Sequence, residues 1–211
     1  MQAVDKKTLL LFQQTPFCAF AAERIGKRFS GRVLCEGISG MARNGLMGNA
    51  PAILVWGDGT NHHLSDLLNI PGSVKYVFDN HQDGAEYGDA PAYDSHNHFS
   101  KEEGVIVRVC YKSGPRLWFS IYDEREGNGL LHISIDLDFL KGFPALPWMS
   151  TGSNESASLY EALGSAMSKH RLVRFDIGGY HEQGDDRAER MNVLETYHIP
   201  MIDLALKAIS P

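Results

Sequence analysis

Short apolar runs recur along the chain, each about the length of one β-strand, and this pattern restricts the folds open to it. They span residues 8–12, 52–56, 74–78, 130–137 and 172–177. Runs this apolar suit strands that are covered on both faces, as in parallel sheets. Segments with helical signals alternate with them, at residues 16–29, 156–170 and 187–209. The alternation predicts an α/β fold with a mostly parallel central sheet and helices on both faces.

Two further apolar runs, residues 105–111 and 117–122, flank a Ser-Gly-Pro segment and predict a hairpin or two neighbouring strands. We also expect a short strand at 32–35, a glycine-rich loop at 37–49, and an interruption of the closing helix near Pro200. With 211 residues and no repeat or linker, the chain is predicted to form a single domain, 1–211.

Charge and cysteine content exclude several classes of protein. A formal net charge of −6 without a basic run argues against nucleic-acid binding. The three cysteines, Cys18, Cys35 and Cys110, form no CxxC pair, which argues against disulfides and thiolate zinc sites. The early apolar run at 9–12 is too short for a membrane span or a signal peptide. We therefore expect a cytoplasmic protein with no nucleic-acid or membrane partner, and its oligomeric state, including a homo-oligomer, stays open.

Asp79, His81 and Asp83 form a D-x-H-x-D pattern directly after the run at 74–78. Carboxylates and imidazoles are the ligands that Mn, Fe and Zn ions prefer. Fully extended, this pattern would span about 13 Å, whereas the ions of a two-metal site lie about 3.5–4 Å apart. The strand must therefore end near Asp79, and the chain must curl after it. The alternative is an ordinary polar loop at the end of a strand.

Ser134, Asp136 and Asp138 form an S-x-D-x-D pattern at the end of another apolar run. On a strand they would share one face with His132, while the leucines and isoleucines between them would share the other. Two aspartates on one face repel each other and lose hydration, and a bound cation removes that penalty. The alternative is that Asp138 has left the strand and is solvated or caps a turn.

Histidines follow a third apolar run, at 52–56. Gly57 and Gly59 allow a tight turn, after which His62 or His63 could lie at the end of the strand. A lone histidine pair is more often part of a surface loop. However, three strand ends now offer ligand-type side chains, and in α/β sheets ligands bind beyond the carboxyl ends of the strands. Together the three segments predict a metal site.

The order of these motifs resembles the arginase–agmatinase (ureohydrolase) superfamily, whose fold is shared with histone-deacetylase-like enzymes. That family has a glycine-rich turn with a metal-binding histidine, then D-x-H-x-D, then S-x-D-x-D. The last two patterns are complete here, whereas Thr60 and Asn61 replace the second glycine and the acid of the first. The chain resembles a short, divergent member, and the resemblance implies a three-layer arginase–deacetylase fold.

By position, the resemblance assigns six residues to two divalent ions: His62, Asp79, His81, Asp83, Asp136 and Asp138. The ions are most often Mn²⁺, with Fe²⁺ or Zn²⁺ as alternatives, and Asp79 and Asp136 would bridge them. A water bridging both ions, its pKa lowered by them, would attack a planar guanidino, amidine or amide carbon. The resemblance thus implies a hydrolase that acts on C–N bonds other than peptide bonds in a small-molecule substrate.

Further site residues are expected outside these motifs. Ureohydrolases have a proton-shuttling histidine between the second and third motifs, and His96 or His98 could serve as that general acid. Two exposed loop histidines are the alternative. The family also has D-I-x-E at its last strand, with an acid that holds the substrate guanidinium, and Gly179 occupies that place here. Glu182 is a nearby substitute, although out of register, and Trp148 is a candidate wall of the substrate pocket.

Two other functions remain open. Because the substrate-binding acid is missing, the chain could be a non-catalytic arginase-fold protein that binds a metal or a small ligand. An amidohydrolase built on His96 and His98 ranks last, because it needs a barrel that 211 residues barely accommodate. Metal analysis followed by a scan of amide, amidine and guanidino substrates separates these functions.

Overall fold

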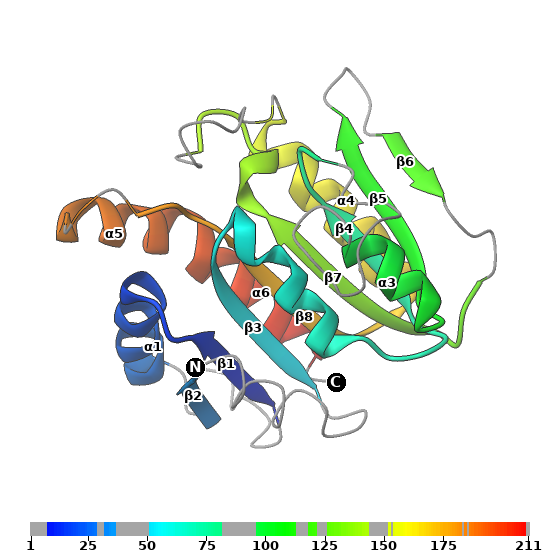
Figure 1. Ribbon diagram of the computed structural model, residues 1–211, viewed down its shortest axis with the longest axis horizontal. Helices are drawn as coiled ribbons and strands as arrows, with labels where there is room; N and C mark the ends of the chain where they lie inside the picture. The colour runs from blue at the N-terminus through cyan, green and yellow to red at the C-terminus, as the bar shows by residue number, and fades with distance from the viewer. Residues whose placement is uncertain are drawn as a thin grey trace.

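The computed structural model describes the protein at residues 8–28, 32–36, 51–81, 96–112, 118–121, 126–143, 152, 154–182, 184 and 186–209. Strands within these residues form one eight-stranded sheet in the order β2-β1-β3-β8-β7-β4-β5-β6 (Figure 1). Their bounds are β1 (Leu9–Gln13), β2 (Arg32–Glu36), β3 (Ala52–Asp58), β4 (Val74–Phe78), β5 (Ile106–Lys112), β6 (Trp118–Ile121), β7 (Leu130–Asp136) and β8 (Arg171–Gly179).

Neighbouring strands run parallel throughout the sheet except for β5 and β6, which form an antiparallel pair at one edge. The predicted mostly parallel sheet is confirmed, and the two runs predicted as a hairpin are β5 and β6. The apolar run at 74–78 coincides with β4. The other runs agree with their strands to within a few residues, because a strand ends where its hydrogen bonds to its neighbours end, and the apolar run does not determine that point.

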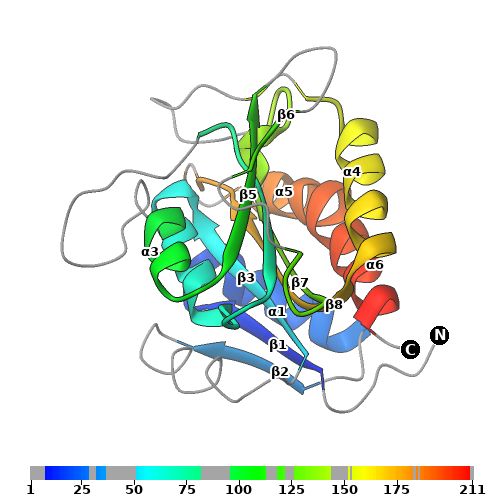
Figure 2. The same ribbon diagram turned by 90° about the vertical axis from the view of Figure 1, so that its right-hand side faces the viewer.

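Helices cover both faces of the sheet (Figure 2). One face is covered by α1 (Pro16–Arg28), α4 (Ser156–Lys169), α5 (Arg187–Val193) and α6 (Ile199–Ile209). The other is covered by α3 (His96–Glu102) and a 3₁₀-helix, η1 (Gly59–Leu68). This is the expected three-layer α/β architecture. Among the described residues, no helix has the length and apolar character needed to cross a membrane.

The two faces of the sheet differ in chemistry. Alternate residues of β7 and β8, such as Ile133, Ile135 and Ile177, join the main apolar core under α1, α4 and α6. The residues between them point to the opposite face. In the middle of that face the buried side chains are largely polar or charged: Lys75, His132, Ser134, Asp136, Arg174 and Asp176. Apolar clusters flank them, around Leu54 of β3 on one side and Val107 of β5 on the other. The sheet therefore places a band of buried polar residues beneath η1 and α3.

The closing helical segment is interrupted as its proline predicts. A short π-helix, Leu194–His198, lies between α5 and α6. Pro200 is the second residue of α6, and a proline lacks the N–H that would bond to the carbonyl four residues earlier, with which its ring also clashes. That carbonyl belongs to Thr196, inside the π-helix, whose wider turn relieves the conflict.

Two helical segments were not expected from the sequence. Residues 59–68, predicted to start with a turn, form η1, and residues 96–102, predicted as loop, include α3. In α3 the buried positions include Asn97 and Ser100, which are polar, so no apolar periodicity announces the helix. The predicted loop at 37–49 lies outside the described residues.

Candidate metal centre

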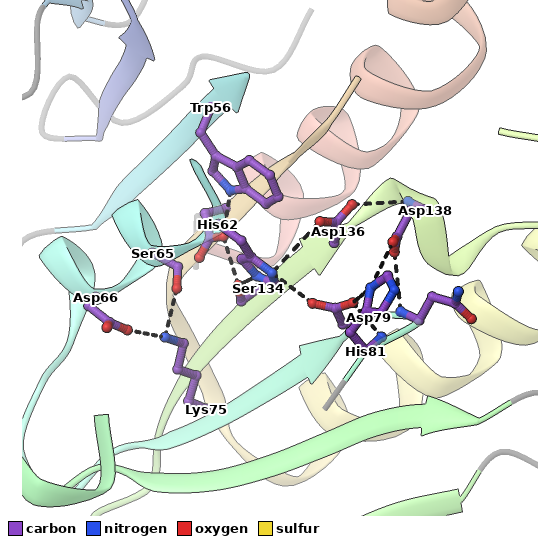
Figure 3. A network of polar contacts seen from close by, with 12 residues as sticks. Trp56, His62, Ser65, Asp66, Lys75, Asp79, His81, Ser134, Asp136 and Asp138 are labelled. Atoms are coloured by element: carbon purple, nitrogen blue, oxygen red, sulfur yellow. Dashed lines mark hydrogen bonds and ion pairs between the residues drawn. The ribbon is translucent and has the colours of Figure 1, made fainter. Parts of the chain in front are cut away.

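The sheet order explains how the two aspartate motifs meet. Strands β4 and β7 are parallel neighbours, with Phe78 opposite Ile135, so their carboxyl ends coincide. Asp79 follows β4, and Asp136 is the last residue of β7. η1 begins after β3 and folds over the same edge, which brings His62 to both aspartates (Figure 3).

His62, Asp79 and Asp136 form the first group. Nδ1 of His62 lies 2.8 Å from Oδ2 of Asp79 and 3.9 Å from Oδ2 of Asp136. All three side chains are at most 2% exposed. One ligand atom from each lies within 4.8 Å of the others, so the three could hold one metal ion. The structure thus places His62 rather than His63 against Asp79.

Asp79, His81 and Asp138 form a second group that shares Asp79 with the first. Nδ1 of His81 lies 3.3 Å from Oδ1 of Asp79 and 3.1 Å from Oδ2 of Asp138. The chain curls after β4 as predicted, because the backbone N–H of His81 donates to Oδ1 of Asp79 (2.7 Å). The N–H of Asn80 donates to Oδ1 of Asp138 (3.2 Å), which ties the two motifs together.

Asp138 reaches this group by a route that differs from the prediction. β7 ends at Asp136, and residues Leu137–Phe139 form a short 3₁₀-helix, η2. Its first turn is capped by Asp136, whose Oδ1 accepts from the N–H of Asp138 (3.0 Å). Asp138 has therefore left the strand, yet it is 1% exposed rather than solvated.

Buried carboxylates give the centre a strongly negative field. The pKa of His81 is raised to about 11, first by its contact with Asp138 and then by Asp79. Burial raises the pKa of Asp138, and the charge of Asp79 raises it further. Oδ2 of Asp138 has its ion-pair contact with His81 but no hydrogen bond. Oxygen and imidazole donors around excess negative charge fit divalent ions such as Mn²⁺, Fe²⁺ or Zn²⁺.

The segment that carries His62 is anchored from below by Lys75 on β4. This lysine is 0% exposed, and its Nζ donates to Oγ of Ser65 (2.7 Å) and Oδ1 of Asp66 (2.8 Å) in η1 (Figure 3). It also donates to Oγ of Ser100 in α3 (3.2 Å). One buried ammonium group thus joins both helical segments that cover the polar face.

Several predicted site residues lie elsewhere or outside the described part of the chain. Asp83 and Trp148 lie outside the described residues. His96 and His98 belong to the first turn of α3, and the structure describes their backbone only. Glu182 forms an ion pair with Nε of Arg190 in α5, so its charge is already matched.

Gly179 occupies a position that no side chain could share with Asp136. It ends β8 with φ +99°, a conformation that other residues rarely adopt. A Cβ atom there would lie 2.1 Å from Oδ1 of Asp136 and 2.9 Å from the backbone nitrogen of Leu137. The backbone at this place therefore leaves no room for the acid that the sequence lacks.

Sequence reasoning missed Trp56 and Asp176. The ring of Trp56 stacks on that of His62, with centroids 4.7 Å apart and planes 17° from parallel. Its Nε1 donates to Oδ1 of Asp176, a fully buried residue of β8 (2.9 Å). The signal available was an acid inside an apolar strand, because a buried carboxylate needs partners.

Several solved structures with the same fold have the names of ureohydrolases. A proclavaminate amidino hydrolase from Streptomyces clavuligerus gives a TM-score of 0.62 at 14% identity, covering 98% of this chain and 93% of that one. A formimidoylglutamase from Bacillus subtilis gives a TM-score of 0.61 at 12% identity, covering 100% of this chain and 90% of that one. An arginase from Bacillus subtilis gives a TM-score of 0.54 at 11% identity, covering 98% of this chain and 99% of that one. The sequence itself matches no protein-family model and no curated protein. The predicted resemblance is thus confirmed by structure: the chain has the three-layer α/β fold of the arginase–agmatinase superfamily.

Proposed function

We propose that the protein is a two-metal hydrolase that cleaves a C–N bond of a small molecule, in a guanidino, amidine or amide group. The observation that carries the proposal is the pair of histidine–carboxylate groups that share Asp79 at the carboxyl edge of the sheet. The printed names of the proteins with this fold, an amidino hydrolase, a formimidoylglutamase and an arginase, support the same reaction class.

The residues fit two cations in number and charge. His62, Asp79 and Asp136 would hold one ion, and Asp79, His81 and Asp138 the other, with Asp83 as a further expected ligand of the first. The three described carboxylates would balance most of the charge of two dications, and Asp83 would balance the rest. Bound cations would offset the burial, and the repulsion by Asp79, that raise the pKa of Asp138. When bound, such ions lower the pKa of water and polarise the group that it attacks.

The surroundings of Gly179 narrow the substrate class. A cationic guanidinium is normally held by a carboxylate in bidentate fashion. Gly179 leaves no side chain beside Asp136, and Glu182 is occupied by Arg190. These two observations favour a substrate whose reacting group is an uncharged amide over one with a guanidinium. The general acid expected at His96 or His98 would protonate the leaving nitrogen.

The test begins with elemental analysis of the purified protein, where we expect about two Mn, Fe or Zn ions per chain. Reconstitution with Mn²⁺ should then give turnover on one class in a panel of amide, amidine and guanidino compounds. The double variant with Asp79→Ala and Asp136→Ala should lose both the ions and the activity. The matched control is Asp203→Asn, which removes an acid from α6 on the opposite face, where it pairs with Arg28. Activity that survives the double variant would refute the proposal.

A second candidate is a non-catalytic arginase-fold protein that binds a metal or a small ligand. The same two observations favour it, because a centre without a free substrate-binding acid at Gly179 or Glu182 could bind ions without turnover. Stoichiometric metal binding with no product from any compound of the panel would support this candidate. Product formation that depends on Asp79 would exclude it.

A further inference from the structure

A buried carboxylate outside both metal-binding groups lies directly behind them. Asp176, on β8, is 0% exposed. Its Oδ1 accepts from Nε1 of Trp56 (2.9 Å) and Oγ of Ser134 (2.8 Å), and its Oδ2 contacts Nε2 of His132 (2.6 Å). Burial alone would raise the pKa of Asp176, but the hydrogen bond from His132 and the nearby positive charge of Lys75 contribute to a combined effect that outweighs it, and the pKa is lowered. The group is therefore an ionised acceptor at neutral pH.

Ser134 connects this carboxylate to the metal centre. A serine hydroxyl has one proton, and an ionised carboxylate has none to give, so Ser134 must donate to Asp176. Toward Nε2 of His62, which lies 2.8 Å away, Oγ is therefore the acceptor. Nε2 of His62 must therefore carry a proton that it donates to Ser134. The other ring nitrogen, Nδ1, faces Asp79 (2.8 Å), so it is the nitrogen that would give up its proton and offer its lone pair to a metal ion bound there.

The plane of the His62 ring is also held from this side. Trp56 lies flat against the ring and is itself fixed by Asp176 through its Nε1. The backbone of β8 leaves room for the indole of Trp56 because Gly178 has no side chain. A Cβ atom at Gly178 would lie 2.2 Å from ring carbons of Trp56. A single carboxylate thus has hydrogen bonds to both Ser134 and Trp56, the two residues that contact the imidazole on the side away from Asp79.

We propose that Asp176 is a positioning residue of the metal centre: through Ser134 it fixes the ring proton of His62 on Nε2, so that Nδ1 is the nitrogen that binds metal. The inference rests on the proposed metal-dependent function. Metal-bound histidines generally donate their second ring N–H to an oxygen partner, and loss of such a partner typically weakens metal binding by about 10–100-fold.

Three variants test this inference through Mn²⁺ binding, measured from the free Mn²⁺ signal by electron paramagnetic resonance. Ser134→Ala removes the acceptor for Nε2, and Asp176→Asn removes the charge that forces the serine to donate away from His62. Both should weaken Mn²⁺ binding by about 10–100-fold. Asp203→Asn makes the same acid-to-amide change in α6, on the opposite face of the sheet, where Asp203 pairs with Arg28. It is the matched control and should bind Mn²⁺ as tightly as the wild type.

A second readout separates positioning from general loosening of the fold. With ¹¹³Cd²⁺ and ¹⁵N-labelled histidine, the wild-type protein should show cadmium coupling to Nδ1 of His62 and a retained proton on Nε2. In Ser134→Ala the coupling should divide between the two ring nitrogens, which a purely structural defect would not cause. Equal Mn²⁺ binding by the wild type and both relay variants, or cadmium coupling to Nε2 in the wild type, would overturn this inference alone. No metal binding by the wild type would overturn the proposed function as well.

Discussion

Replacing Gly179 with alanine should damage both the fold and the metal centre, because two independent penalties meet at this residue. A non-glycine residue in a sparsely populated backbone region costs about 1–3 kcal/mol, and Gly179 has φ +99°. Forcing an extra methyl group into a packed site costs a further 1–3 kcal/mol or so, and here the new Cβ would lie 2.1 Å from Oδ1 of Asp136. The sum is about 2–6 kcal/mol, against a total stability of about 5–15 kcal/mol for a typical domain.

Urea unfolding of the metal-free protein measures the first part of this prediction, and Mn²⁺ titration measures the second. The clash can be relieved only by moving the carboxylate of Asp136 or the start of η2, so Mn²⁺ affinity should fall even where the variant folds. The matched control is Gly164→Ala, at an exposed position in α4 where a Cβ meets no atom within 4 Å. That change should stabilise the protein by about 0.5–1 kcal/mol. A Gly179→Ala protein with wild-type stability and wild-type Mn²⁺ affinity would refute the reasoning.

Three further predictions concern groups away from the proposed metal ligands. Lys75→Met should cost about 3–5 kcal/mol in urea unfolding, since it strips the buried Asp66 of its cation, and adding Asp66→Leu should recover much of the loss. Burial lowers the pKa of His198 from 6.5 to about 4, so the unfolded chain takes up this proton first and the folded state loses stability as the pH falls through that interval. The loss should approach 3 kcal/mol or so, and His198→Leu should remove that part of the pH dependence. Cys35 is exposed and the other two cysteines are buried. A thiol reagent should therefore modify one cysteine rapidly in the folded protein and all three in denaturant. Rapid modification of all three cysteines under native conditions would contradict the structure.

The strand framework and the two aspartate motifs were predictable because each depends on a local pattern. The run at 74–78 has the bounds of β4, and the need for a curl after Asp79 followed from the length of an extended chain. The prediction that Asp138 shares the strand with Asp136 was wrong, because the cap formed by Asp136 starts η2 immediately. The roles of the individual ligands, and of His96 and His98, stay predictions.

The parts that could not be predicted depend on long-range polar contacts. η1 and α3 are both tied to the sheet by the buried ammonium of Lys75. In η1 apolar packing is limited to its second half, through Leu64 and Leu68, and α3 buries Asn97 and Ser100, so neither segment has the long apolar stripe that marks a helix in a sequence. The partners of Asp176 come from β3 and β7, far away along the chain, and their convergence is a property of strand order. No periodicity in a single sequence encodes that order.

The stacking of Trp56 on His62 gives the protein an optical reporter of its own. Because the indole of Trp56 is in contact with the imidazole of His62, its fluorescence should be sensitive to a metal ion bound by that imidazole. A paramagnetic ion such as Mn²⁺ or Co²⁺ at His62 would quench its fluorescence, whereas Zn²⁺ would leave the emission bright. Trp118 and Trp148 supply the background, and Trp56→Phe identifies the responsive part of the signal. Metal binding at the proposed His62 position could therefore be followed without any label, and an ion bound by the proposed group of Asp79, His81 and Asp138 should quench the emission more weakly.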